Sequence, residues 1–190
     1  FEQALRTLAS ADGTLDANWL NWLQTSGAPR LGLDEVKVER DVGEFSALRN
    51  RGSADVIIKV GPERSVEVEA REGKLDNVKT EIEDGSLDIN VKGFNVGRVV
   101  VRVTTPDLNT LVMTGSGDVD LEGVTGESFH LRTTGSGDAK VAGEVKALDL
   151  KSVGSGDVQG SALETESAVV VSTGSGNVEL TASDEVTGKM

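Results

Sequence analysis

The amino-acid sequence predicts an all-β protein: a right-handed β-solenoid, or β-helix, with coils of about 19–20 residues and a short N-terminal helical segment. Three observations favour this fold class. Glycine is abundant and aromatic residues make up only 3% of the chain, a composition typical of short strands joined by tight turns. A Gly-Ser-Gly unit occurs four times at nearly constant spacing, and apolar and polar residues alternate on both sides of it.

Each repeated unit places an acidic or amide residue directly after Gly-Ser-Gly. The segments are MTGSGDVDL, TTGSGDAKV, SVGSGDVQG and STGSGNVEL, and successive units are separated by 20, 19 and 20 residues. A period of this size is typical of proteins in which successive coils stack on one another. The four predicted turns consist of Gly115, Ser116, Gly117 and Asp118; Gly135, Ser136, Gly137 and Asp138; Gly154, Ser155, Gly156 and Asp157; and Gly174, Ser175, Gly176 and Asn177.

Alignment of the repeats predicts which side chains are buried. Four residues before each first glycine stand Leu111, Leu131, Leu150 and Val170. Their neighbours, such as Arg132, are mostly polar, which is the period-2 alternation of a strand with one buried face. Stacked coils would place the four apolar side chains above one another inside the protein, with strands about 4.8 Å apart.

The chain divides into two predicted parts. Residues 34–190 are expected to form the solenoid domain, because blurred versions of the repeat occur upstream as GSADVIIKV from Gly52 and DGSLDINV from Asp84. Residues 1–33 carry apolar residues at helical spacing and are predicted to form a helical cap or a linker.

Two tryptophans, Trp19 and Trp22, lie in the N-terminal segment. An open solenoid end exposes core and unpaired strand groups, so we expect the helix that carries them to act as a cap. The alternative is a docking surface for a partner protein or a carbohydrate ring. Phe94, in the segment KGFNVG, is a candidate for the same kind of docking.

The charge of the chain limits the classes of molecule that it is expected to bind. The formal net charge is −13 and the sequence pI is about 4.5, and the cations are interspersed with a larger number of acids. Nucleic acid and anionic membrane surfaces are therefore not expected as partners. No apolar run approaches the roughly 18 to 20 residues that a transmembrane helix needs. The absence of cysteine excludes a disulfide framework and a thiolate site.

The Gly-Ser-Gly-Asp turns are predicted to be architectural. Glycine tolerates positive φ and close packing, and the Ser and Asp side chains can accept hydrogen bonds from turn amides. Calcium binding is the alternative, because a column of carboxylate, hydroxyl and carbonyl oxygens offers the ligands that calcium prefers. The calcium-binding RTX repeat has a different period and residue order, however. We therefore expect neither a metal nor another cofactor.

Catalysis has little support in the sequence. His130 is the only histidine, Cys and Tyr are absent, and His130 is expected to point outward beside Arg132. The serines of the turns have no repeated base near them. The sequence therefore predicts a protein that is not an enzyme. A polysaccharide-active β-helix enzyme that uses only acidic and basic residues stays open as the alternative.

The segment SAVVVS near the C-terminus breaks the polar pattern. If Val170 is buried, Val169 and Val171 point outward, where the preceding repeats carry charged residues. This apolar pair predicts a partner surface or a homo-oligomer contact. The alternative is that the tail SDEVTGKM or the N-terminal segment covers it.

The ordered motifs resemble a known family. GEFSALRNRGSADVIIKVG is followed by DGSLDINVKG, by VVVRVTTPDLNTLVMTGSGDVDL and by further Gly-Ser-Gly-Asp repeats. This order, over roughly Val42 to Ala182, is similar to the head GIN domain family, whose members are labelled putative autotransporter adhesins. The resemblance implies a β-solenoid domain on an exported bacterial protein, with no established catalytic residues. Asn177 departs from the pattern, since the other repeats have Asp at that position.

Together, the residues and the resemblance predict a non-enzymatic binding or adhesion module of the cell envelope, in the periplasm, on the outer membrane surface or outside the cell. It would present a repetitive β-solenoid surface to a glycan or a protein. The alternatives are a polysaccharide-active β-helix enzyme and a structural assembly subunit.

Overall fold

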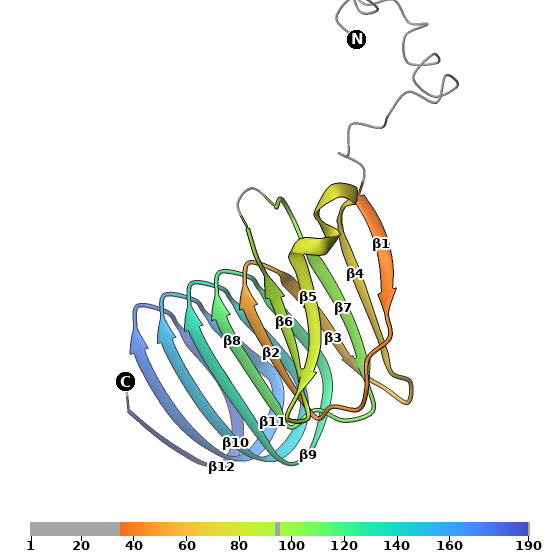
Figure 1. Cartoon of the computed structure of the whole chain (residues 1–190). Helices are drawn as coiled ribbons and strands as arrows, with labels where there is room; N and C mark the ends of the chain where they lie inside the picture. The colour runs from red at the N-terminus through yellow and green to blue at the C-terminus, as the bar shows by residue number, and fades with distance from the viewer. Residues whose placement is uncertain (1–34, 94–95, 190) are drawn as a thin grey trace, which may run out of the picture. The chain divides into compact units, whose positions relative to one another are not determined.

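The computed structural model describes residues 35–93 and 96–189, which form strands and one short 3₁₀ helix (Figure 1). The all-β part of the prediction is therefore confirmed. Trp19, Trp22, Phe94 and the predicted N-terminal helical segment lie outside the described residues. The elements are β1 (Glu35–Arg40), β2 (Ala47–Gly52), β3 (Asp55–Val60), β4 (Ser65–Arg71), η1 (Glu72–Asn77), β5 (Val78–Glu83), β6 (Ser86–Val91), β7 (Val100–Thr105), β8 (Thr110–Gly115), β9 (Val119–Gly135), β10 (Ala139–Gly154), β11 (Val158–Gly174) and β12 (Val178–Lys189).

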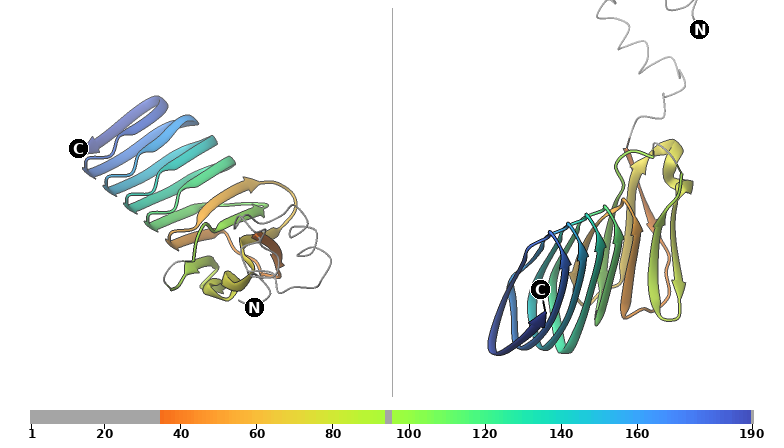
Figure 2. Two further views of the ribbon diagram at one scale, coloured as in Figure 1. Left: turned by 90° about the horizontal axis from the view of Figure 1, so that it is seen from above. Right: turned by 90° about the vertical axis from the view of Figure 1, so that its left-hand side faces the viewer.

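The strands of the described residues belong to one mixed sheet. Its order is β1-β4-β7-β3-β9-β8-β2-β6-β5, while β10 pairs with β9 and β11, and β11 pairs with β12. The β1–β4, β4–β7 and β5–β6 pairs are antiparallel, and the remaining pairs are parallel. Figure 2 shows the parallel strands from β8 to β12 side by side, in the order of their colours from green to blue. The sheet folds around one core into a nearly closed, barrel-like arrangement. The prediction of a right-handed β-solenoid is therefore wrong.

The physical reason lies upstream of the first Gly-Ser-Gly-Asp unit. The segment that begins at Asp84 was expected to form a blurred coil. Instead, Asp84 and Gly85 are the two central residues of a tight hairpin between β5 and β6, with φ angles of 50° and 71°. Asp-Gly favours such a turn because both central residues need positive φ. Antiparallel pairs therefore interrupt the regular coils in this half of the domain, where β2–β6 and β3–β7 are still parallel.

The four repeated segments nevertheless stack in parallel. Leu131 of β9 pairs with Leu111 of β8 and Leu150 of β10, and Leu150 pairs with Val170 of β11. All four side chains are buried. The predicted buried column is therefore confirmed. Each long strand also bends, because the first part of β9 pairs with β3 and its last part with β8.

Glycines of the repeated turn let neighbouring main chains approach closely. The carbonyl oxygen of Gly115 accepts hydrogen bonds from the N–H groups of Ser136 and Gly137, at N···O distances of 2.9 and 3.3 Å. Gly135 has a φ of 125°, and a Cβ atom at this position would collide with the same carbonyl oxygen. The close stacking of main chains therefore requires glycine in the turn.

Candidate functional site

The residue after each Gly-Ser-Gly takes part in a row of hydrogen bonds between neighbouring turns. Each member's Oδ1 accepts the backbone N–H of the next member, at N···O distances of 3.4, 2.9, 2.8 and 2.7 Å in chain order. The prediction that these carboxylates bind turn amides is confirmed. The Asp ladder, as we name it, consists of Asp55, Asp118, Asp138, Asp157 and Asn177.

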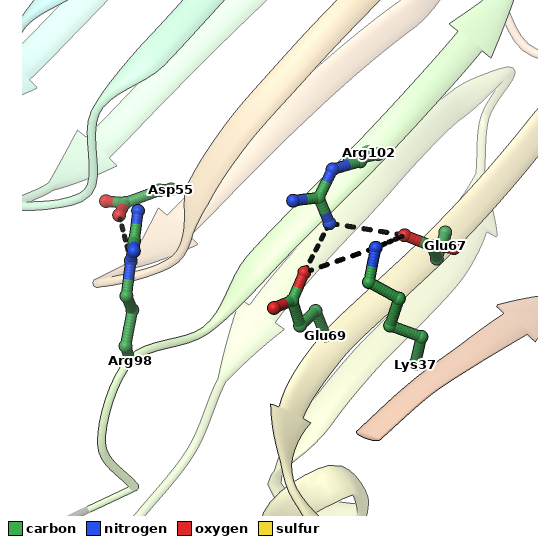
Figure 3. Close-up of polar contacts among 6 residues, drawn as sticks. All are labelled: Lys37, Asp55, Glu67, Glu69, Arg98 and Arg102. Atoms are coloured by element: carbon green, nitrogen blue, oxygen red, sulfur yellow. Dashed lines mark hydrogen bonds and ion pairs between the residues drawn. The ribbon is translucent and has the colours of Figure 1, made fainter. Parts of the chain in front are cut away.

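Both ends of the Asp ladder reduce the repulsion between its carboxylates. At one end, Arg98 Nε lies 3.5 Å from Asp55 Oδ2 (Figure 3). At the other end, Asn177 is neutral and its Nδ2 donates to Asp157 Oδ1 at 3.2 Å. Within the part of the chain that the structure describes, no group of three or more His, Cys, Asp or Glu side chains is placed to hold a metal ion. The geometry of the ladder suits a structural role at the turns.

A second polar cluster connects β1, β4 and β7 (Figure 3). Arg102 lies between two carboxylates, 2.6 Å from Glu69 Oε2 and 3.2 Å from Glu67 Oε1, and Lys37 lies 3.2 Å from the same Glu67 oxygen. The hydrogen bond from Arg102 lowers the pKa of Glu69, and the carboxylate in turn raises the pKa of Arg102. This cluster holds three strands together through opposite charges that lie side by side.

A shallow recess of about 530 Å³ lies where β9, β10, β11 and β12 bend. Four exposed carboxylates and one lysine contribute to its lining. Lys146 Nζ donates to Glu127 Oε1 at 2.7 Å, and this contact raises the pKa of Lys146. Most of the charge around the recess is therefore negative. The carboxylates belong to Glu127, Glu144, Glu164 and Glu166.

The outer face of the last parts of β9 to β12 carries the apolar pair predicted from the sequence. Val169 is 54% exposed, while Val171 is half-buried. Val169 pairs with Asp149 of β10 on one side and Thr187 of β12 on the other. The predicted outward orientation of Val169 is confirmed. The tail forms part of β12 beside it and leaves it exposed.

His130 lies on the same outer face, one strand from Asp149. Its Nδ1 is 3.3 Å from Asp149 Oδ2, and Arg132 approaches the same oxygen at 3.4 Å. The side chains of all three residues are between 41% and 48% exposed. His130 is therefore a partly solvated member of a surface ion cluster, as expected from its position in the sequence.

A row of positive charges on this face was not recognised from the sequence. Strand register places Arg49, Val112, Arg132, Lys151, Val171 and Lys189 in succession across β2, β8, β9, β10, β11 and β12. We call its four charged members, Arg49, Arg132, Lys151 and Lys189, the cationic row. A signal was available, because three of them stand three residues before the first glycine of a turn.

The sequence-predicted binding residues are only partly placed by the structure. Val169 and Val171 lie on the outer face with the cationic row. Trp19, Trp22 and Phe94 lie outside the described residues, so their predicted docking roles stay predictions.

Comparison with known proteins shows which family the chain belongs to. The family described as "Putative auto-transporter adhesin, head GIN domain" matches residues 44–190. The chain belongs to this family. The match covers the Asp ladder and the cationic row, so both are features of the GIN domain in this chain. No curated protein matches the chain.

Solved structures show the same GIN-type fold. The crystal structure of a putative adhesin from Bacteroides fragilis has a TM-score of 0.67 and 18% sequence identity, and the match covers 82% of this chain and 84% of that one. A putative adhesin from Parabacteroides merdae has a TM-score of 0.51 and 13% identity, with 82% and 92% covered. Among the described residues, no helix is long and apolar enough to cross a membrane.

Proposed function

We propose that this GIN domain is a non-enzymatic binding module of an exported protein, in the periplasm, on the outer membrane surface or outside the cell. Its ligand would be a glycan or a protein. Membership of an adhesin family supports a surface-binding role in general. The outer face of β9 to β12 is the part of the module that we assign to the ligand.

One observation carries this assignment. Parallel strands in register repeat the same positions side by side, so the outer face offers aligned rows of side chains rather than a single pocket. Val169, 54% exposed, lies among charged and polar neighbours on this face. An exposed apolar side chain within a polar surrounding is a common feature of interaction surfaces.

A glycan array and a panel of surface proteins, probed with the full chain with and without chelator, test the proposal. We expect binding to a discrete class that survives the chelator and falls with Val169→Glu. Ile57→Glu is the matched control, because Ile57 is 41% exposed and lies on β3, which pairs with the first part of β9, whereas Val169 is in register with its last part. Equal losses in the two variants, or no binding to any probe, would contradict the assignment.

The acidic recess is the observation that favours the alternative, a polysaccharide-active enzyme. Its carboxylates and Lys146 are of the type that such enzymes use. A general acid needs a raised pKa, which burial normally provides, whereas Glu127, Glu144, Glu164 and Glu166 are all exposed. Release of reducing ends from a polysaccharide, lost in Glu164→Gln, would establish the enzyme instead.

A further inference from the structure

We infer that the cationic row binds a polysaccharide that carries carboxylate or sulfate groups. The inference rests on the proposed binding function, because it names the ligand class for the same outer face. Four properties of the outer face support it: the alignment of the charges, their separation from the acidic parts of the domain, the shortage of exposed aromatic rings, and the open form of the face.

The charges of the cationic row are aligned across the sheet. Arg132 and Lys151 are direct partners on neighbouring parallel strands, so their Cα atoms lie about 4.8 Å apart. Arg49 lies two strands before Arg132, and Lys189 two strands after Lys151. Because all these strands run in the same direction, the charges form one line that crosses the sheet. A linear chain of anionic groups matches such a line better than an isolated anion does.

The cationic row is separated from most of the carboxylates of the domain. Among the described residues, two members of the row have a carboxylate within ion-pair distance: Asp88 lies 3.3 Å from Arg49, and Asp149 lies 3.4 Å from Arg132. No carboxylate of the described residues lies within ion-pair distance of Lys151 or Lys189. The row is therefore locally positive in a protein of net charge −13.

The negative charge of the rest of the domain does not cancel this local field. The acidic recess begins five residues before Arg132, at Glu127, which is roughly 16 Å along an extended strand. Physiological salt screens interactions between exposed charges beyond about 8 Å. A ligand on the outer face therefore interacts mainly with Arg132, Lys151 and the other members of the row.

The third property of the outer face is its shortage of exposed aromatic rings. Phe45 and Phe129 are the aromatic residues of the described part of the chain, and both are buried. Among the described residues, the outer face therefore has no Phe, Tyr or Trp ring on which the apolar side of a neutral sugar could rest, and its one ring, the imidazole of His130, contacts Asp149. Its contacts must come from charges, from hydroxyls such as those of Thr110 and Thr134, and from the exposed surface of Val169. This composition favours an anionic over a neutral glycan.

The fourth property of the outer face is its open, extended form. A single exposed ion pair contributes little to affinity, because solvent and salt weaken it. Several weak contacts become effective when one polymer makes them together. The cationic row spans the strands from β2 to β12, and only its last member, Lys189, lines a recess. Such an open row suits an extended polymer that contacts several strands.

The test measures binding of the full chain to polygalacturonate, dextran sulfate, neutral dextran and polyglutamate. We expect binding to at least one of the two anionic polysaccharides, weakening as salt is added, and little binding to dextran or polyglutamate. Lys151→Gln with Lys189→Gln should weaken binding roughly tenfold, since two ion pairs are lost. The double variant Lys59→Gln with Lys140→Gln removes the same charge from other strand positions and should change binding less than about twofold.

Each outcome decides the inference. Binding to polygalacturonate alone, or to dextran sulfate alone, supports it and identifies the charged group. Equal effects of the two double variants overturn it, as does stronger binding to polyglutamate, which would indicate an acidic protein partner. Binding to neutral glycans alone overturns the inference but leaves the proposed binding function intact. Failure of the proposed function appears separately, as absence of any ligand on the glycan array and protein panel.

Discussion

The side-chain Oδ1 of Asp157 accepts the backbone N–H of Asn177 at 2.7 Å. In the Asp ladder, each side chain before Asn177 thus accepts the N–H of the following turn, and each member after Asp55 donates its own N–H to the preceding side chain. The last member needs no carboxylate for this purpose. Asn177 therefore fits the end of the ladder, and its neutral amide avoids one more negative charge beside Asp157.

This arrangement predicts different outcomes for two substitutions of Asp138. Asn keeps an oxygen that can accept the N–H of Asp157, whereas Ala does not, so Asp138→Ala should lower the free energy of unfolding by about 0.5–1.5 kcal/mol. Asp138→Asn should change it by less, and at low salt it should stabilise, because it removes a charge between Asp118 and Asp157. Urea unfolding at low and high salt measures both. A larger loss in Asn than in Ala would contradict the hydrogen-bond role.

The glycine corner predicts a strong effect of a single methyl group. A Cβ at Gly135 would meet the carbonyl oxygen of Gly115 and would also need a φ of 125°. Gly126 has a comparable φ of 147° but no atom within 4 Å of the added Cβ, so it reports backbone strain alone. Gly135→Ala should destabilise at least about 2 kcal/mol more than Gly126→Ala. Equal midpoints in chemical unfolding would show that the close approach is not required.

The buried column predicts a large cost for truncation of Leu131. Leu131 is 1% exposed and lies between Leu111 and Leu150 in neighbouring strands. Leu131→Ala removes its contacts on both sides, so we expect a loss of about 2–5 kcal/mol. Val169→Ala, at a position that is 54% exposed, should change stability by less than about 0.5 kcal/mol and serves as the control. Calorimetry or urea unfolding distinguishes the two.

The contact between Glu69 and Arg102 predicts a pH dependence. Arg102 lowers the pKa of Glu69 below its ordinary value of 4.5, so folding favours the ionised carboxylate. The stabilisation is fully present above pH 4.5 and is lost as the pH falls through the lower folded-state pKa. Wild type should melt above Glu69→Gln at neutral pH, and the two melting curves should converge in acid. A difference that stays constant with pH would assign the effect of the variant to packing instead.

Local repetition made part of the fold predictable. The Gly-Ser-Gly-Asp segments predicted both the buried column at Leu131 and the amide bonds of the Asp ladder, because identical residues in register have identical environments. The hairpin at Asp84 was missed, since Asp-Gly-Ser was aligned with the repeat although Asp-Gly is itself a strong hairpin signal. The error extended a local period over strands whose pairing partners lie far away in the sequence.

The candidate site was less predictable for a similar reason. The outward direction of Val169 follows from alternation along one strand, and the sequence predicted it. The cationic row depends on register across many strands. Arg49 is aligned with Arg132 only through β8, which lies between β2 and β9. Lys189 is aligned with the row through the β11–β12 pair, whose register shifts along its length. The ion cluster of Lys37, Glu67 and Arg102 depends on antiparallel pairing between β1, β4 and β7, which no sequence repeat indicates.

Self-association through the outer face is the remaining prediction from the sequence. In the described part of the chain, β12 pairs only with β11, so one edge of β12 has no neighbouring strand, and edges of this kind favour pairing with another chain. Val169 lies on β11, the strand that pairs with β12, and offers exposed apolar area near that edge. We therefore expect the full chain to form a concentration-dependent homo-oligomer.

The double variant Val169→Lys with Val171→Lys tests this contact in sedimentation experiments. Two added charges on each copy should repel one another, so the variant should be monomeric at concentrations where the wild type associates. The same charges extend the cationic row and should strengthen binding to an anionic polysaccharide, so loss of association together with gain of binding excludes simple misfolding. A wild type that stays monomeric at every concentration would contradict self-association and leave Val169 free for a ligand.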